Sequence, residues 1–335
     1  MLGIDVSKET LTGALVAAAD RRLCWEITVP NTAHGIAQLI RRTPPSDAWV
    51  VEPTGIYSRR VVQQAHAVGR QVLLAQPKRA KAFLASVQPR AKTDRVDSRG
   101  LALYGLSATL RPFPLTSEAM ERIEQLLAAR KGISGSLVRL RQQRAVLAHA
   151  ADPLTAAITA LEAQQTVIDR QLSEARTVLP VVTTLREIPG IGPVTATAVA
   201  VCLTTKQFDH PDQFVAYIGL DTRVRDSGQH KGRRALSKQG DAELRRLFYL
   251  CAQANIRSRD PANPFKQQYE REKAKGLTTT GALCAVARKL ARTCWSLEQH
   301  GTRYEGERVN RQPVTRVRDR AIESSNDRKE LDNHP

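Results

Sequence analysis

Apolar and polar positions along the first third of the chain change period repeatedly, from the alternation of strands to the three-and-four spacing of helices. Runs rich in apolar and β-branched residues predict strands at Leu2–Val6, Leu11–Ala17, Leu23–Val29, Trp49–Val51 and Val72–Leu74. Helical spacing predicts helices at Ala33–Arg41, Tyr57–Ala67, Arg79–Val87 and Asp94–Leu106. Three successive strands are therefore followed by strands that alternate with helices.

This order is typical of an RNase H-like α/β fold, in which a three-stranded meander is joined to βαβ units. In that layout Asp5 lies within the first, central strand, and Glu52 lies at the carboxyl end of a neighbouring strand. Open α/β sheets bind their ligands at the carboxyl ends of strands. We therefore expect both acidic side chains at the edge where the sheet holds a ligand.

The second third of the chain is predicted to form two long helices. Between residues 117 and 180 apolar residues recur alternately three and four apart, in two runs separated by Asp152-Pro153. Asp152 is placed to cap the second helix, with Pro153 at its first helical position. The spacing fits an antiparallel hairpin or an intermolecular coiled coil. Two amphipathic helices of one compact bundle fit it equally well.

Helical patterns return after residue 183, interrupted by a basic loop, and continue to about residue 300. The final residues are polar and charged with almost no apolar side chains, which predicts a disordered tail. The sequence thus predicts an α/β plus all-α protein of four segments. They are an α/β domain (1–112), a helical hairpin (113–182), a helical domain (183–300) and the tail (301–335).

The charge balance narrows the class of partner. Lysine and arginine number 51 against 33 acidic residues in a chain of 335, a net charge of +18. Such an excess indicates a polyanionic partner, most often nucleic acid, although some basic proteins have none. The five cysteines are scattered, which favours reduced, buried thiols in a cytosolic protein over disulfides or a zinc site. No apolar run approaches the roughly 18 residues of a membrane span, and no signal peptide is visible.

Four acidic residues are out of keeping with this basic background. Asp94 and Asp97 lie three residues apart and would share one helix face. Taken alone, this pair is better explained without a metal ion: Asp94 would be a helix cap near Thr93, and Asp97 would be a solvated surface acid. Together with Asp5 and Glu52 they are better explained as a metal site. Without a nearby His or Cys the oxygen ligands favour Mg²⁺ or Mn²⁺, and two such ions about 4 Å apart suit phosphodiester cleavage.

Two further stretches are candidates for contacts with nucleic acid. The turn Pro189-Gly190-Ile191-Gly192 opens a helix, as in a helix-hairpin-helix, where Gly190 and Gly192 let backbone N–H groups approach a phosphate. A tight interhelical turn without a ligand is the alternative. The second stretch, Thr222 to Gly240, is rich in glycine and carries six basic residues: Arg223, Arg225, Lys231, Arg233, Arg234 and Lys238.

Ser237 lies in the same basic stretch, just before a predicted helix from Ala242 to Ala252. A serine at such a place is usually a helix cap or a surface hydroxyl, and the residue pattern alone does not favour a nucleophile.

Seven short motifs occur in a characteristic order along the chain. They are Gly3-Ile4-Asp5-Val6-Ser7-Lys8, Glu52-Pro53-Thr54-Gly55-Ile56-Tyr57, Lys92-Thr93-Asp94-Arg95-Val96-Asp97, Ile188-Pro189-Gly190-Ile191-Gly192, Phe214-Val215-Ala216-Tyr217-Ile218-Gly219-Leu220, Ser237-Lys238-Gln239-Gly240 and Ala287-Arg288-Lys289-Leu290. Each is weak alone, but in this order, from about Leu2 to Leu297, the chain resembles the IS-one-ten class of DEDD transposases and the related Piv-type DNA invertases.

The resemblance implies a RuvC-like domain whose Mg²⁺ or Mn²⁺ ligands, also catalytic, are Asp5, Glu52, Asp94 and Asp97. It implies a C-terminal transposase domain whose nucleophile is Ser237. Expected partners are donor and target DNA, a structured noncoding bridge RNA, and further copies of the chain in a dimer or tetramer. The expected location is the bacterial cytoplasm, at the nucleoid. One departure is Ser98, which stands where many relatives have alanine.

Three other functions share parts of this pattern. A RuvC-type junction nuclease would use the same acids with water in place of a serine. A non-enzymatic binder would keep the turn and the basic loop and tolerate alanine at Asp5 and Glu52. An actin-like sugar kinase can begin with Gly-Ile-Asp-Val, but the chain has no second glycine-rich phosphate loop and its basic helical half does not suit that class.

Overall fold

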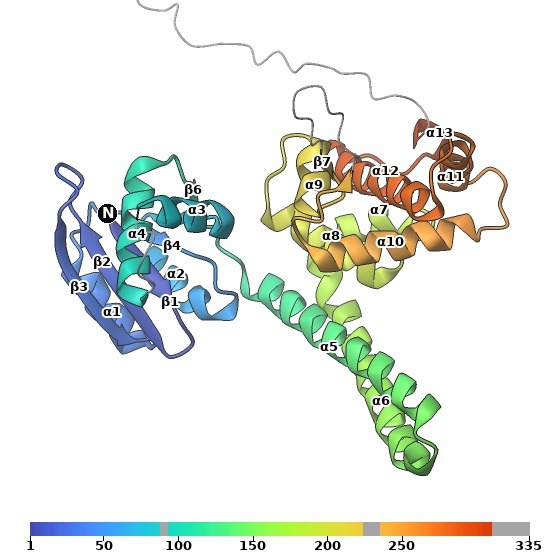
Figure 1. The fold of residues 1–335 in the computed structure, drawn as a ribbon, viewed down its shortest axis with the longest axis horizontal. Coiled ribbons are helices and arrows are strands. Elements are labelled where there is room, and N and C mark those ends of the chain that lie inside the picture. The colour runs from blue at the N-terminus through green and yellow to red at the C-terminus, as the bar shows by residue number, and fades with distance from the viewer. Residues whose placement is uncertain (88–92, 224–234, 310–335) are drawn as a thin grey trace, which may run out of the picture. The chain divides into compact units, whose positions relative to one another are not determined.

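The computed structural model describes residues 1–87, 93–223 and 235–309. The chain divides into two compact units, Met1–Arg122 and Ile123–Pro335. The first is a mixed α/β unit, and the described part of the second is almost entirely helical (Figure 1). The division into four segments remains a prediction.

A six-stranded sheet forms the centre of the first unit. Its strands lie in the order β3-β2-β1-β4-β5-β6, with β1, β4 and β5 parallel to one another and β2, β3 and β6 joined by antiparallel pairing. The bounds are β1 (Leu2–Val6), β2 (Thr10–Val16), β3 (Leu23–Pro30), β4 (Trp49–Val51), β5 (Val72–Leu74) and β6 (Arg111–Pro112). The five predicted strands are confirmed, and the topology is compatible with an RNase H-like fold.

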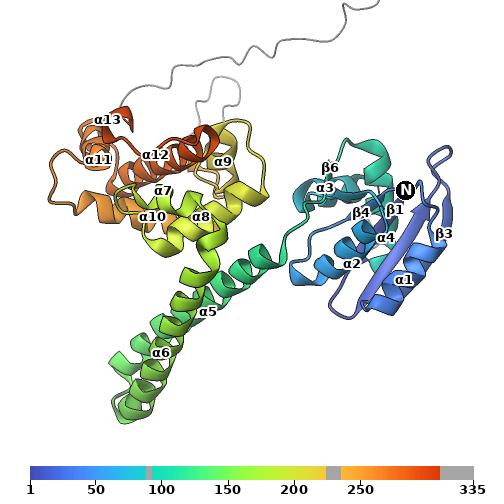
Figure 2. The same cartoon turned by 180° about the vertical axis from the view of Figure 1, so that it is seen from behind.

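Helices cover both faces of this sheet, as Figures 1 and 2 show from opposite sides. They are α1 (Ala33–Arg42), α2 (Ile56–Ala67), α3 (Pro77–Val87) and α4 (Asp94–Ser107). Leu2 and Ile4 of β1 pack in one core with Ile36 of α1 and Val61 of α2. Because side chains alternate along a strand, the odd residues of β1 face the opposite side, where α4 packs.

Gly3 fixes the distance between β1 and α4. A Cβ at this position would collide with the backbone oxygen of Ser98 and the backbone nitrogen of Ala102. Only glycine allows so close an approach of helix and strand. Ser98 is fully buried at this contact, and its hydroxyl donates to the Arg95 carbonyl oxygen at 3.0 Å, so the departure from alanine leaves no unpaired polar group.

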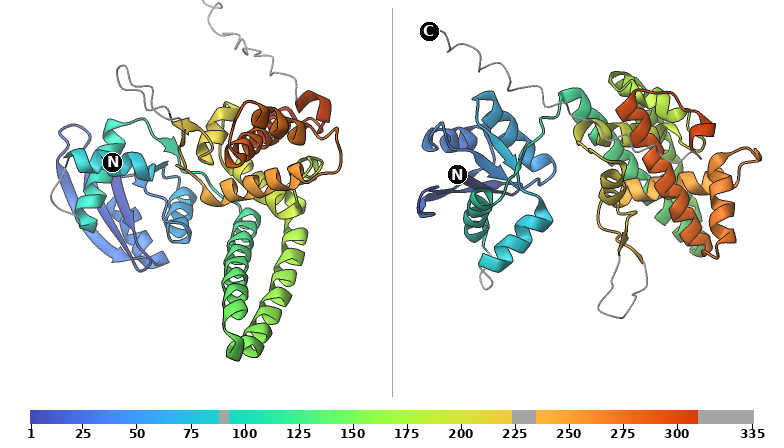
Figure 3. Two further views of the ribbon diagram at one scale, coloured as in Figure 1. Left: turned by 45° about the vertical axis from the view of Figure 1, so that its right-hand side comes forward. Right: turned by 90° about the horizontal axis from the view of Figure 1, so that it is seen from above.

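Two long helices, α5 (Glu118–Val146) and α6 (Ala151–Ala175), form an antiparallel hairpin within one chain, seen at the left of Figure 3. Side-chain contacts connect them along their length: Arg130 with Asp169, Ser134 with Gln165, and Arg141 with Glu162. The paired numbers rise on one helix as they fall on the other, which confirms the predicted hairpin. An intermolecular coiled coil remains a prediction.

The predicted start of the second hairpin helix is wrong by two residues. A 3₁₀ turn at Ala148–Ala150 leads directly into α6, whose N-cap is Ala150, and no side chain caps the helix. Asp152 and Pro153 are therefore its second and third residues. Both residues still suit these positions. Pro153 has no N–H group, and the first N–H groups of a helix have no intrahelical partner. The helix dipole favours an acidic residue such as Asp152 in the first turn.

Seven more helices and a two-stranded ribbon make up the rest of the described second unit. Their bounds are α7 (Val181–Arg186), α8 (Pro193–Thr205), α9 (Pro211–Tyr217), β7 (Thr222–Arg223), β8 (Ala235–Leu236), α10 (Ala242–Ile256), α11 (Pro264–Ala274), α12 (Thr279–His300) and α13 (Gly306–Val309). A second short 3₁₀ turn, Arg176–Val178, precedes them. Helix α12 packs against α9, α10 and α11 and buries Leu290 and Cys294 completely.

The prediction of a disordered tail from Gly301 is wrong for its first residues. Tyr304 stacks on Phe265, with ring centroids 6.5 Å apart, and its backbone N–H donates to Glu187 at 3.2 Å. This ring contact and the hydrogen bond to Glu187 connect the segment to the helical unit. Residues 310–335 lie outside the described residues.

All five cysteines are free, as predicted, and four of them are buried, whereas Cys24 is exposed. Cys24 is the second residue of β3, a sheet-edge strand whose first two residues are exposed, and strand alternation alone does not reveal this. Among the described helices none is both long enough and apolar enough to span a bilayer.

Candidate active site

Asp5 and Glu52 are brought together by the register of two parallel strands. Residues Ile4 and Val51 are partners in the parallel pairing of β1 with β4. Asp5 directly follows Ile4, and Glu52 directly follows Val51, so the two acids come at matching places along the two strands. Both side chains are partly exposed at the carboxyl ends of their strands. This is the edge at which open α/β sheets bind ligands, as the sequence predicted.

Asp94 and Asp97 lie in the first turn of α4. The cap of this helix is Thr93, whose hydroxyl accepts a hydrogen bond from the Val96 backbone N–H at 3.3 Å. The simpler interpretation of Asp94 as the cap is therefore wrong. Both aspartates lie at the N-terminal end of the helix, where the helix dipole is positive. The contact at Gly3 holds the same helix against the strand that carries Asp5.

The four carboxylates act on one another electrostatically. Burial, followed by the charges of Asp94, Asp97 and Glu52 in that order of importance, raises the pKa of Asp5 to about 6. Burial also raises the pKa of Glu52, with a contribution from Asp97. Like charges gathered at one place disfavour their own ionisation unless a cation balances them. The structure therefore brings all four predicted acids within electrostatic range.

This arrangement fits a hard divalent cation by its chemistry. All four groups are carboxylates, the ligands that Mg²⁺ and Mn²⁺ prefer, and their mutual repulsion is the strain that such a cation relieves. Within the described ranges, however, no three His, Cys, Asp or Glu side chains stand close enough to form a finished metal cluster. The carboxylates would have to draw closer to bind an ion, and the metal-ligand assignment remains a prediction.

Ser237 lies in the second unit, directly after the β7–β8 ribbon. Thr222 and Leu236 are partners in this ribbon, so Asp221 and Ser237 form the next cross-strand pair. The Ser237 backbone N–H donates to the Asp221 carbonyl oxygen at 2.9 Å, and the Ser237 hydroxyl donates to the Asp221 carboxylate. Sequence reasoning missed Asp221. Its only signal was the place directly after the Ile218-Gly219-Leu220 motif.

The loop that carries Ser237 is fastened to the end of α9. The backbone N–H of Lys238 donates to Gly219 at 3.2 Å, and that of Asp241 donates to Tyr217 at 2.8 Å. Gly240 has a φ of 142°, and a Cβ there would collide with the Tyr217 carbonyl oxygen. Lys238 has a φ of 52°, a left-handed conformation that non-glycine residues adopt at an energetic cost. The backbone around Ser237 is thus fixed rather than open.

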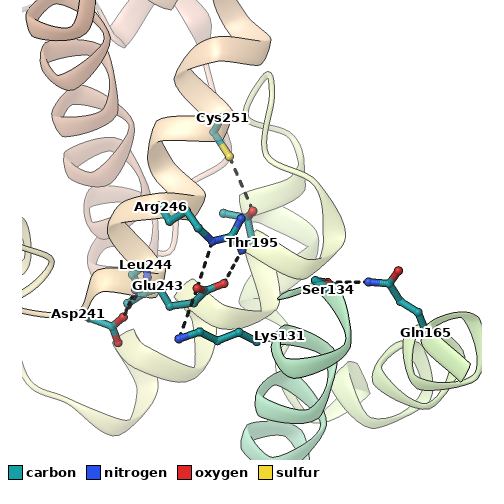
Figure 4. Close-up of polar contacts among 9 residues, drawn as sticks. All are labelled: Lys131, Ser134, Gln165, Thr195, Asp241, Glu243, Leu244, Arg246 and Cys251. Carbon is teal, nitrogen blue, oxygen red and sulfur yellow. Dashed lines mark hydrogen bonds and ion pairs between the residues drawn. The ribbon is translucent and has the colours of Figure 1, made fainter. Parts of the chain in front are cut away.

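Ser237 does not cap the following helix. The N-cap of α10 is Asp241, whose carboxylate accepts from the backbone N–H groups of Glu243 and Leu244 at 2.9 and 3.0 Å (Figure 4). Glu243 pairs with Arg246 and with Lys131 of α5. The hydrogen bond from Arg246 is the main cause of the lowered pKa of Glu243. The helical hairpin is therefore attached to the helix that begins beside the serine.

The glycine-rich turn before α8 has the predicted form. Gly190 has a φ of 78°, Gly192 is the N-cap, and Pro193 begins the helix. The amide of Asn255, which is almost fully buried on α10, donates to the Pro189 carbonyl oxygen at 2.8 Å. A Cβ at Gly192 would meet open space, so the outer side of the turn is accessible. Asn255, which sets this turn, carried no signal in the sequence.

The predicted basic contacts are only partly described by the structure. Lys238 is exposed beside Ser237. Arg223 lies in β7, at the base of the ribbon. Arg225, Lys231, Arg233 and Arg234 lie outside the described residues. Their role in binding nucleic acid remains a prediction.

Comparisons with known proteins find transposase relatives for both the α/β unit and the helical unit. A transposase family model of the IS110 DEDD type matches residues 2–150, and a model of the Transposase IS116/IS110/IS902 family matches residues 182–270. The pilin gene-inverting protein of Moraxella bovis is 25% identical over 303 residues, 86% of this chain and 92% of that protein. The transposase for insertion sequence element IS1328 of Yersinia enterocolitica is 31% identical over 119 residues, 35% of this chain and 36% of that protein.

A sheet with acidic residues at its carboxyl edge, joined to a helical unit matched by a second transposase model, defines an enzyme of the DNA transposase and recombinase class. More narrowly, the chain belongs to the IS110 class of DEDD transposases.

Proposed function

We propose that this enzyme cuts and rejoins DNA strands through a phosphoserine intermediate, using the carboxylates of the first unit and Ser237 of the second. The observation that carries the proposal is the convergence of Asp5, Glu52, Asp94 and Asp97, produced by the β1–β4 register and by the close packing of α4 at Gly3. A basic chain of net charge +18 supports a nucleic-acid substrate.

In this proposal the four carboxylates hold Mg²⁺ or Mn²⁺. When bound, the metal supplies positive charge to the phosphate that reacts. Asp5 and Glu52 hold their positions through the sheet, and Asp94 and Asp97 through the first turn of α4. Lys238, with Arg233 and Arg234, contributes further positive charge toward the phosphates. Gly190 and Gly192 present backbone N–H groups to the DNA backbone without reading its sequence.

Ser237 attacks a phosphodiester and becomes esterified to the DNA. A covalent ester conserves the free energy of the broken bond, so rejoining to a new strand needs no ATP. The relatives' names describe gene inversion and transposition, and the proposed chemistry serves either outcome. In line with the family resemblance, a bridge RNA would select donor and target DNA. The serine of one subunit would act with the carboxylates of another in a dimer or tetramer arranged by the α5–α6 hairpin.

Adduct formation tests this proposal. Wild type and Ser237→Ala are incubated with DNA, Mg²⁺ and RNA transcribed from the DNA that flanks the gene, and the products are run on a denaturing gel. Ser258→Ala is the matched control, because that hydroxyl lies in the same unit and accepts only a local hydrogen bond from the Asp260 backbone. We expect a protein–DNA adduct in wild type and control and none in Ser237→Ala.

An adduct that persists in Ser237→Ala removes this serine as the nucleophile. Nicked DNA without attached protein in every sample would favour the second candidate, a RuvC-like junction nuclease that acts by hydrolysis. The converging carboxylates serve that chemistry equally well.

A further inference from the structure

The side chain bonded to the Ser237 hydroxyl is Asp221, and neither the family motifs nor the charge pattern assigns it a role. Three observations about this pair bear on its chemistry: the direction of the hydrogen bond, the backbone that holds both residues, and the charged group behind Asp221. Each comes from contacts within the second unit.

The direction of the hydrogen bond matters first. An ionised carboxylate has only acceptor oxygens, so the shared proton belongs to Ser237 and points at Asp221. A serine hydroxyl is a weak nucleophile at its ordinary pKa, and enzymes activate such groups with an adjacent base within hydrogen-bond reach.

The pair is also held by several independent contacts. Asp221 and Ser237 are cross-strand neighbours through the β7–β8 register, and the Ser237 backbone N–H donates to the Asp221 carbonyl oxygen. The Gln239 backbone N–H donates to the Ser237 hydroxyl oxygen at 3.3 Å, which leaves the hydroxyl proton directed toward Asp221. Geometry of this kind lowers the cost of aligning nucleophile and base.

Behind this pair lies Arg288 of α12. Its Nε donates to the Leu220 carbonyl oxygen at 3.1 Å, which fixes the residue before Asp221. The carboxylates of Asp212 and Asp221 both act on the Arg288 charge, although burial and the neighbouring Arg292 lower the pKa of Arg288 overall. The guanidinium therefore lies within electrostatic range of the Asp221 carboxylate.

We propose that Asp221 is a catalytic residue, the general base that takes the proton of Ser237 as this serine attacks DNA; the proposal rests on the proposed function of Ser237. The O–H bond of Ser237 breaks and its proton passes to the Asp221 carboxylate, while the Oγ–phosphorus bond forms. The electron pair of the broken phosphodiester bond leaves with the sugar oxygen. That oxygen gains a proton from solvent as Asp221 returns one, so the net change exchanges one phosphate ester for another.

The rejoining step reverses these roles. Asp221 first takes a proton from solvent. A DNA hydroxyl then attacks the phosphoserine and loses its proton to solvent, while the Oγ–phosphorus bond breaks and the Ser237 oxygen regains a proton from the Asp221 carboxyl group. One side chain thus serves as base for cleavage and acid for joining, as microscopic reversibility requires of a single site.

The test compares Asp221→Asn with Asp221→Ala in a timed adduct assay with the same DNA, RNA and Mg²⁺. Asparagine keeps an oxygen that accepts the serine proton in a hydrogen bond but cannot take it, whereas alanine removes the acceptor too. We expect both variants to form the adduct about 10²- to 10⁴-fold more slowly than wild type, the range for loss of a general base. If Asp221→Asn formed the adduct at a rate within about threefold of wild type, the proposal would be overturned, because a hydrogen-bond acceptor at this position would then be enough for the reaction.

Asp260→Asn is the matched control, since Asp260 is exposed in the same unit and accepts a local hydrogen bond from the Ala262 backbone N–H. Melting temperature and DNA binding are measured for every variant. If Asp221→Asn unfolds, Asp221→Glu takes its place: an adduct rate at least tenfold above that of Asp221→Ala supports the base, and an equal rate refutes it. Loss of the adduct in Ser237→Ala with normal rates in both Asp221 variants would sink this proposal alone. An adduct in Ser237→Ala would sink the proposed function itself.

Discussion

The two candidate catalytic regions of this chain differ in how far their polar groups are satisfied. In the first unit, burial and three neighbouring acids raise the pKa of Asp5. In the second unit, the Ser237 hydroxyl and the Asp221 carboxylate satisfy each other, and the backbone on both sides is hydrogen-bonded. The first region is therefore organised to receive a charged ligand, and the second is complete within the protein.

Asp5→Asn has the largest expected effect on the carboxylate region. The substitution keeps the size of the side chain and removes one of four proposed metal-binding charges. We expect strand cleavage to fall by about 10²- to 10³-fold or more, because metal coordination of a reacting phosphate supplies several kcal/mol. The measurement is the initial rate of DNA cleavage with saturating Mg²⁺.

Asp20→Asn is the control for that substitution. Asp20 belongs to the same unit and is exposed in the turn between β2 and β3, where it accepts only from the Arg22 backbone. Its cleavage rate should equal that of wild type. If Asp5→Asn also cleaves at the wild-type rate, the carboxylates do not serve the reaction.

Gly3→Ala has the next largest effect and acts on the geometry of the same region. The added methyl group would collide with the backbone of α4, so the helix that carries Asp94 and Asp97 must move away from β1. We expect a loss of about 2–3 kcal/mol in the free energy of unfolding, as for an overpacked core. Cleavage activity should fall as well.

Gly132→Ala is the matched control for Gly3→Ala, and it is expected to change stability in the opposite direction. Gly132 lies in α5, where a new Cβ meets open space. Alanine there should stabilise the protein by about 0.5–1 kcal/mol. Thermal melting of both variants checks the pair, and an unchanged melting curve for Gly3→Ala would show that α4 does not depend on the contact.

Sequence patterns were sufficient for the parts of this molecule that depend on local periodicity. The strands that carry Asp5 and precede Glu52, and the helix that carries Asp94 and Asp97, follow from alternation and helical spacing. The edge at which the acids meet follows from the strand order. That the acids stop short of a finished metal cluster depends on side-chain distances, which no sequence pattern contains.

Contacts between distant segments could not be predicted in the same way. Asp221 reaches Ser237 because the β7–β8 ribbon pairs Thr222 with Leu236, and no pattern of residue types predicts that register. Asn255 holds the Pro189 carbonyl oxygen from another helix, through a packing arrangement that only the tertiary structure defines. A polar residue inside a helical pattern looks the same whether it faces solvent or supports a turn 66 residues away.

A further predicted effect concerns the pH dependence of stability, and its sign should differ between the two regions. Asp5 has a folded pKa of about 6 against an ordinary value of 3.8. Because this pKa is raised, the folded protein loses stability as pH rises from about 4 to 6, and the deficit is complete above pH 6. The full shift corresponds to about 3 kcal/mol, which solvent around a partly exposed carboxyl reduces to about 1–2 kcal/mol.

Without divalent metal at pH 7.5, Asp5→Asn should therefore be more stable than wild type by about 1–2 kcal/mol, and near pH 4 the gain should vanish. Added Mg²⁺ should raise the melting temperature of wild type more than that of the variant. Asp221→Asn should instead lose about 1 kcal/mol at pH 7.5, since it weakens a hydrogen bond to a charged acceptor. A loss of stability in Asp5→Asn at pH 7.5 would mean that the carboxylates of the first unit carry no unbalanced charge, and the case for a cation there would fail.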